Sequence, residues 1–219
     1  TLLYQVLRSS GEQTSADTNL TSAFSVGTGV RVVNADKLFS QGSIVSTDNA
    51  LDLAVDGAGF FQVLLPDGRI GYTRNGTFSR NNEGALTTSS GFVIQPEVVI
   101  PEDAQEINVS SDGVVSVQLP GAVEQEEVGQ IELAEFQNRN GLQPIGESFY
   151  VETTASGEAI IANPLEGSFG KLVQGALESS NVSVVKELVD MIETQRAYEV
   201  NSKAISGVDD MLRFVAQNL

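Results

Sequence analysis

Three aspartates, Asp48, Asp52 and Asp56, lie four residues apart and are the first candidates for chemistry in this sequence. On a helix this spacing would place three carboxylates on one face, where they could bind a metal ion or transfer protons. The residues between them do not follow a helical pattern, because apolar and polar residues alternate over 51–56. That alternation predicts a half-buried strand with Asp52 and Asp56 on the solvent side. We therefore expect neither catalysis nor metal binding at these aspartates.

The residue types that many enzymes use for nucleophilic catalysis are missing. The 219 residues include no His and no Cys, which excludes Ser-His-Asp and Cys-His systems, disulfides and ordinary structural zinc sites. Two glycine pairs, at 57–59 and 27–29, lack the third Gly and the following helix that a dinucleotide-binding loop needs. The sequence thus predicts no catalytic residue, no cofactor and no metal.

The chain is strongly acidic, with 29 Asp and Glu against 12 Lys and Arg and a net charge of −17. Such a charge repels nucleic-acid phosphates and anionic lipid surfaces, so we expect no nucleic-acid partner. No run approaches the ~20 apolar residues of a membrane-spanning helix, so we expect no direct membrane insertion. Residues 81–138 contain eleven acids and no base. This stretch is either a solvated face that keeps the protein soluble or a surface that faces a partner.

The sequence divides into three regions. Residues 1–50 are polar and irregular and predict an extended arm or linker with short β segments, such as 29–33. Residues 51–176 combine short apolar runs with Gly-containing turns and predict a β-rich domain. Residues 177–219 predict a helix. The expected fold class is therefore mainly β with a long C-terminal α-helix of the coiled-coil type. The strands expected in the β-rich domain are 51–56, 60–65, 70–73, 92–94, 107–109, 114–119 and 131–136.

The predicted helix carries an unbroken apolar row, the heptad row, in which every seventh residue from Val184 to Leu219 is apolar. Residues 182–219 contain one Gly, Gly207, and no Pro, and either Asn181 or Ser183 can cap the helix start. A second heptad row begins at Leu188 but is polar through the middle of the helix, so the seam has one strong and one weak row. The residues that we expect at a subunit interface are Val184, Leu188, Met191, Tyr198, Ile205, Leu212 and Leu219.

The length of this helix favours a projecting element. At 1.5 Å per residue it would span ~57 Å, whereas a compact body of the remaining residues is only ~40 Å across. The apolar row on the projecting part would stay in water unless a partner helix covers it. The alternative is a helix that folds back over the sheet, with a bend at Gly207.

Several segments have distinctive sequences. They are residues 49–63 (NALDLAVDGAGFFQV), residues 72–78 (YTRNGTF) with 84–87 (GALT) and Gly91, and residues 180–205, which include ELVDMIETQRAYE. Together they closely resemble the bacterial flagellar basal-body rod and hook family. Residues 1–5, 26–32 and 37–42 look most like the distal rod members of that family, and the modest β region argues against the hook protein, which carries a larger inserted domain.

The resemblance implies a structural role without catalysis. Family members assemble helically into a hollow shaft in the periplasm, with terminal helices inside and β domains outside, and are exported unfolded through the flagellar type III channel. The implied partners are further copies of the chain, the proximal rod proteins, the hook protein that receives the torque, and the P-ring and L-ring proteins around the shaft. The family's N-terminal helix is absent from this sequence, which therefore looks like a subunit that lacks one of its two helices.

Other functions remain open from the sequence. A proximal rod or hook-family subunit is the nearest alternative. A carboxylate-dependent glycan hydrolase would use a pair of the many acids, although no acid lies at a position that the sequence marks as a cleft. A monomeric β module of the adhesin type is a third class.

Overall fold

The structure is a computed structural model that describes residues 4–8, 13–15, 18–19, 24–27, 37–121 and 124–217, without the side chains of 4–27, 212, 215 and 216. The chain divides into two compact units, Thr1–Leu38 and Phe39–Leu219. In the first unit β1 (Tyr4–Arg8) pairs antiparallel with β4 (Phe24–Gly27), and β2 (Gln13–Ser15) pairs with β3 (Thr18–Asn19). The β segment expected at 29–33 lies outside the described residues.

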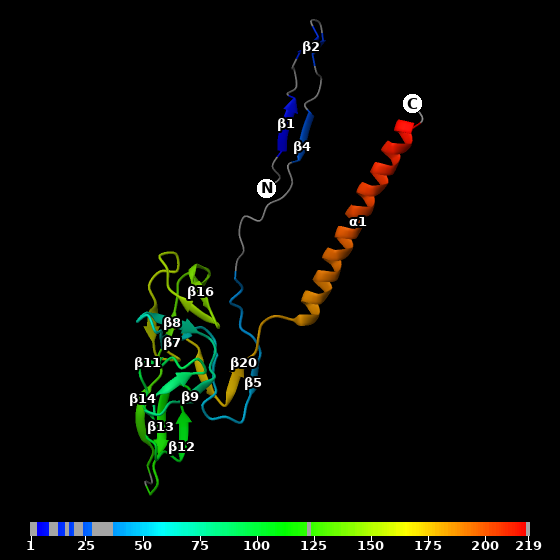
Figure 1. Cartoon of the computed structure of the whole chain (residues 1–219). Helices are drawn as coiled ribbons and strands as arrows, with labels where there is room; N and C mark the ends of the chain where they lie inside the picture. The colour runs from blue at the N-terminus through cyan, green and yellow to red at the C-terminus, as the bar shows by residue number, and fades with distance from the viewer. Residues whose placement is uncertain are drawn as a thin grey trace. The chain divides into compact units, whose positions relative to one another are not determined.

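The second unit consists of short antiparallel strands followed by one long helix, α1 (Figure 1). This confirms the predicted fold class. The strands are β5 (Ile44–Ser46), β6 (Leu53–Asp56), β7 (Phe60–Leu64), β8 (Ile70–Thr73), β9 (Phe78–Arg80), β10 (Leu86–Thr88), β11 (Ile94–Gln95), β12 (Glu106–Val109), β13 (Val114–Gln118), β14 (Glu126–Gln130), β15 (Leu133–Glu135), β16 (Gln143–Gly146), β17 (Phe149–Val151), β18 (Ile160–Ala162), β19 (Lys171–Gln174) and β20 (Ala176–Glu178), with a 3₁₀ turn, η1, at Arg139–Gly141.

The largest sheet has seven strands, in the order β16-β17-β8-β7-β15-β18, with β11 also paired to β7. Its central hairpin, β7–β8, pairs Phe61 with Thr73 and Leu64 with Ile70. The turn between them contains Gly68, whose φ of 81° is the conformation that glycine adopts without strain. The predicted strand–turn–strand at 60–73 is therefore confirmed. Strands β16 and β18 lie at the two ends of this order, and β11 is a further terminal strand.

Smaller ladders accompany the main sheet. β12, β13 and β14 form a three-stranded sheet, β9 pairs with β10, β19 with β6, and β20 with β5. The strands expected at 107–109, 114–119 and 131–136 are found as β12, β13 and β15. The last two pairs join residues near 45–55 to residues near 171–178, so they bring the start and the end of the β-rich region together.

Two apolar clusters form the core. The larger contains Leu53, Val55, Phe61, Ile131 and Leu133 among fourteen buried residues, and the smaller centres on Phe60, Tyr72 and Phe136. Aromatic rings pack edge to face in both, with centroids 5.1 Å apart for Phe61–Phe78 and 4.7 Å apart for Tyr72–Phe136. Such pairs add to the stabilisation from apolar burial.

Strand β6 differs from the prediction. A half-buried strand was expected, but Leu53, Ala54 and Val55 are all buried, so both faces of β6 are covered. Asp52, expected on the solvent side, is only 6% exposed and accepts hydrogen bonds from Thr47 Oγ1 (2.7 Å) and Asn49 Nδ2 (2.9 Å). The prediction for Asp52 is wrong because this carboxylate organises the turn before β6 instead of facing water.

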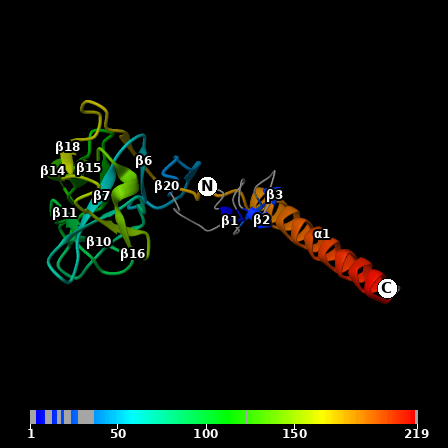
Figure 2. The same ribbon diagram turned by 90° about the horizontal axis from the view of Figure 1, so that it is seen from above.

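Helix α1 (Val184–Gln217) has 34 residues and runs without interruption (Figures 1 and 2). At 1.5 Å per residue it is about 51 Å long. The first helical hydrogen bond runs from the amide of Glu187 to the carbonyl oxygen of Ser183 (3.0 Å), which places Ser183 at the N-cap position. Among the described residues, no helix is long and apolar enough to cross a membrane.

Candidate functional site

The apolar row that the sequence predicts lies on α1. The side chains of Val184, Leu188, Met191, Tyr198 and Ile205 are between 49% and 76% exposed. Leu212 is part of the helix, but its side chain is outside the described set, and Leu219 lies outside the described residues altogether. An α-helix advances by 3.6 residues per turn, so residues seven apart form one slowly drifting row.

The exposure extends around the whole helix. Every described α1 side chain is exposed, including Val185, Val189, Ile192, Val200 and Val208, which the heptad row does not contain. A helix folded back over the sheet would bury one of its faces, and no described α1 residue is buried. Covering each large apolar side chain would contribute about 1.5–3 kcal/mol. This surface is therefore the main candidate for a protein contact in the described part of the chain.

A short ribbon attaches the segment before α1 to the β-rich domain. Strands β5 and β20 pair antiparallel, and the amide of Ser179 donates to the carbonyl oxygen of Ser43 (2.8 Å). Asn181 Nδ2 donates to the backbone oxygen and to Oγ of Ser40 (2.9 and 3.1 Å). Asn181, expected as a possible helix cap, thus holds the segment that follows the N-terminal unit. A Cβ at Gly42 would lie 1.8 Å from the carbonyl oxygen of Ser179, so this close pairing requires glycine there.

Arg74 is the central residue of this attachment. Its Nε donates to Glu178 Oε2 (2.9 Å), and its Nη1 donates to the carbonyl oxygens of Gly57 (2.9 Å) and Gly59 (2.6 Å). Glu178 Oε1 in turn accepts from the amide of Gly42 (2.9 Å). Both charged side chains are largely buried, where charge-assisted hydrogen bonds are strong. Arg74 therefore connects the end of β8, the β6–β7 turn and the strand that leads to α1.

Sequence reasoning missed this pair. Arg74 belongs to the YTRNGTF motif but was given no role, and Glu178 lies 104 residues further along the chain. No periodicity or local spacing connects two positions so far apart.

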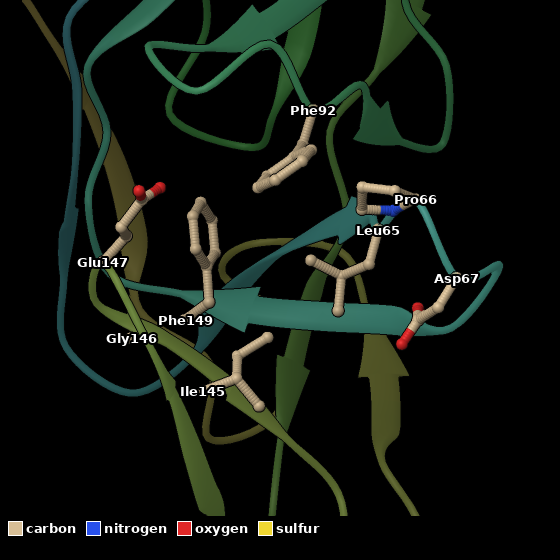
Figure 3. A pocket seen from close by; sticks show the side chains of 8 residues that line it. All are labelled: Leu65, Pro66, Asp67, Phe92, Ile145, Gly146, Glu147 and Phe149. Atoms are coloured by element: carbon tan, nitrogen blue, oxygen red, sulfur yellow. The ribbon is translucent and has the colours of Figure 1, made fainter.

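A cavity of about 400 Å³ opens beside the β7–β8 turn and the β16–β17 turn (Figure 3). Phe92 and Phe149 form one wall, with ring centroids 5.2 Å apart, and Leu65 and Ile145 line the rest. The two acids at its edge already have partners. Asp67 pairs with Arg69 (2.6 Å), whose hydrogen bond lowers the pKa of that carboxyl, and Glu147 accepts from Ser90 Oγ (2.6 Å). The cavity thus suits an apolar group and has no pair of free acids for hydrolysis.

Asp48, Asp52 and Asp56 do not come together as a group of metal ligands. Asp52 is held in its turn, and Asp56 pairs with Lys171 Nζ at 3.3 Å. No group of three or more acidic residues within the described ranges is placed to hold a metal ion. The eleven acids of residues 81–138 are spread over the surface instead. Glu132 and Glu135 are half-buried, and the other nine are exposed.

Comparison with known protein families gives two matches. A domain described as the flagellar hook protein FlgE/F/G D1 domain matches residues 54–117, and the C-terminal domain of flagellar basal-body rod FlgEFG proteins matches residues 173–218. The second match contains strand β20 and the described part of α1.

Curated relatives match nearly the full chain. The flagellar basal-body rod protein FlgG of Buchnera aphidicola subsp. Schizaphis graminum is 47% identical over 216 residues, which cover 99% of this chain and 83% of the relative. The chain belongs to the flagellar basal-body rod family. FlgG of Caulobacter vibrioides is 44% identical over 99% of this chain and 83% of its own length. The flagellar hook protein FlgE of Salmonella typhimurium is 43% identical over only 51% of this chain and 28% of its own length.

Family membership decides between the functional classes. The relatives are structural flagellar proteins, so this chain is a structural component of the flagellar basal body and not an enzyme. A glycan hydrolase has no support among them. The much lower coverage of the hook protein agrees with the stronger resemblance to the rod members.

Proposed function

We propose that this chain is a subunit of the distal flagellar rod that assembles with copies of itself through α1. The observation that carries the proposal is the exposure of every described apolar side chain of α1 in a member of the rod family. Leaving that surface in water forgoes most of the stabilisation it can provide. The proposed seam consists of the heptad row Val184, Met191, Tyr198, Ile205, Leu212 and Leu219, together with Leu188 of the second row.

The β-rich domain is proposed to form the outside of the shaft. Its exposed acids support this arrangement, because like charges on an outer surface keep it from sticking to surrounding acidic or apolar surfaces. The surrounding proteins would be the P-ring and L-ring proteins in the periplasm. The ends of the shaft would contact the proximal rod proteins and the hook protein, and torque would pass to the hook.

Substitution in the helix seam tests this function. We expect Ile205→Asp in the full chain to abolish polymerisation, because a carboxylate in an apolar contact carries a desolvation cost of several kcal/mol. Polymer formation is measured by sedimentation and electron microscopy, and folding of the β-rich domain by near-ultraviolet circular dichroism.

Ser206→Asp is the matched control, since it adds the same charge at the next residue of α1, about 100° around the helix from Ile205 and opposite the apolar residues at that height. Polymers of normal length from Ile205→Asp would contradict the proposal. So would equal loss of assembly in both variants, because that would show an effect of charge alone.

A further inference from the structure

The apolar surface of α1 consists of two faces at different heights. The first, the 184–192 face, contains Val184, Val185, Leu188, Val189, Met191 and Ile192. The second, the 197–211 face, contains Ala197, Tyr198, Val200, Ala204, Ile205, Val208 and Met211. All of these side chains are exposed.

The two faces lie on opposite sides of the helix. At about 100° per residue, the directions of the 184–192 face average about 60° from Val184, and those of the 197–211 face average about 230°. Polar residues confirm the change of side. Lys186, Asp190 and Glu193 lie opposite the first face, and Ser202, Ser206 and Asp210 lie opposite the second. The change occurs over three polar residues, Thr194, Gln195 and Arg196.

One straight partner helix cannot cover both faces. A helix that packs alongside α1 buries a stripe about 100° wide or somewhat more, and these faces are about 170° apart. At least two neighbours on opposite sides are therefore required. The heptad row of Met191, Tyr198 and Ile205 lies along the border between the faces, which is why a single row does not reveal them.

The two faces are complementary in shape. The 184–192 face presents only large side chains, whereas the 197–211 face has Ala197 and Ala204 between its large residues. Large side chains on one helix pack well against small ones on a facing helix.

The low net charge of the α1 region also permits two copies to approach each other there. Residues 182–219 carry six acids against four bases, whereas residues 39–181 carry twenty acids against five bases.

From these observations, and resting on the proposed self-assembly, we propose that the 184–192 face of one copy packs on the 197–211 face of a second copy. The centres of the faces are about 15 residues apart along α1, so successive copies whose helices run parallel are displaced along the helix axis by ~23 Å. Because the contacting faces differ, the contact is head-to-tail. Each copy keeps one face free for the next, which produces an open helical array instead of a closed dimer.

Cross-linking between cysteines tests the proposal directly, because the chain has no Cys of its own. Leu188→Cys and Ala204→Cys are made separately in full chains, one of them with a size tag, and mixed during assembly. Mild oxidation or a short bis-maleimide then joins cysteines that lie within reach. We expect a mixed dimer of the two variants in sedimented assemblies and little product from either variant alone.

Matched variants make the result specific. Ser206→Cys lies at nearly the same height as Ala204 but on the polar side, and it should not cross-link to Leu188→Cys. Ile192→Cys with Val208→Cys is a second pair with the same separation, for use if one of the first variants fails to assemble.

The outcomes separate this inference from the proposed function. Normal assembly without mixed product, or with product mainly between two Leu188→Cys chains, would overturn the head-to-tail contact while self-assembly stands. Equal product from Ser206→Cys would also overturn it. Loss of assembly in the unmodified chain would overturn both.

Discussion

The β-rich domain and helix α1 use apolar residues in opposite ways. In the domain, large side chains such as Phe61, Ile131 and Leu133 are completely buried, and no buried side-chain nitrogen or oxygen in the described residues lacks a partner. In α1, the described apolar side chains are all exposed. The domain therefore contains the contacts that stabilise it, whereas α1 gains the stabilisation of apolar burial only when another molecule covers it.

Two isoleucines test this difference with the same substitution. Ile131 is 0% exposed and Ile205 is 67% exposed. We expect Ile131→Ala to lower the free energy of unfolding of the domain by about 2–5 kcal/mol, because it loses buried surface and leaves a cavity. Ile205→Ala should change it by less than about 0.5 kcal/mol and should instead weaken assembly. Chemical denaturation of the unassembled chain measures both, and similar losses in the two variants would contradict the comparison.

The same contrast explains what the sequence could predict. The hairpin at 60–73 was predicted correctly because two apolar runs enclose an Asp-Gly turn, which is a local signal. The helix was also predicted from a local signal, because its apolar heptad row is continuous and the segment contains no Pro. Secondary structure that depends on neighbouring residues could therefore be predicted from the sequence.

Features that depend on contacts between residues far apart in the sequence could not be predicted. β16 contains Pro144 and Gly146 and is exposed at all four positions, so it resembles a loop in sequence although it forms the edge of the main sheet. Asp52 was assigned to solvent because alternation cannot show that both faces of β6 are covered. The two apolar faces of α1 can be derived from the sequence. A heptad pattern, however, selects only one row of residues, and it does not show that the apolar residues move to the opposite side of the helix after residue 192.

The attachment of α1 gives the next largest expected effect. Arg74→Leu should lower the free energy of unfolding by about 2–3 kcal/mol, because it removes charge-assisted hydrogen bonds and leaves Glu178 without its cation in a largely buried site. Glu178→Gln is the milder companion, since its amide oxygen can still accept from Gly42, and we expect a loss of about 1 kcal/mol.

Hydrogen exchange shows where the effect lies. In Arg74→Leu the amides of β5 and β20 should exchange faster, while those in the centre of β7 and β8 keep most of their protection. Uniform loss of protection across the domain would show that Arg74 acts on the whole core and not on the attachment.

Tyr72 provides a pH-dependent test of the domain core. Burial and, to a smaller extent, the nearby Glu152 carboxylate together raise the pKa of Tyr72 to about 12 from its ordinary 10.0. The unfolded chain therefore loses this proton first. The stability that depends on neutral Tyr72 is complete below pH 10.0 and is lost as the pH rises toward about 12.

Denaturation at several pH values, combined with the absorbance of tyrosinate, measures this effect. Tyr72→Phe should reduce the fall in stability above pH 10.0 and remove one high-pH tyrosinate transition. An unchanged pH dependence in Tyr72→Phe would show that another group is responsible.

Two glycines, one in the β-rich domain and one in α1, differ in the space around them, and this difference gives the smallest expected effect. A Cβ at Gly76 would lie 1.5 Å from the carbonyl oxygen of Leu53, whereas a Cβ at Gly207 would meet nothing within 4 Å. Gly207→Ala should therefore stabilise α1 by up to about 1 kcal/mol, because alanine costs less conformational entropy in a helix. Amides near residue 207 should exchange about fivefold more slowly in the unassembled chain. Faster exchange would show that α1 is already constrained by contacts there, and that its surface is not free.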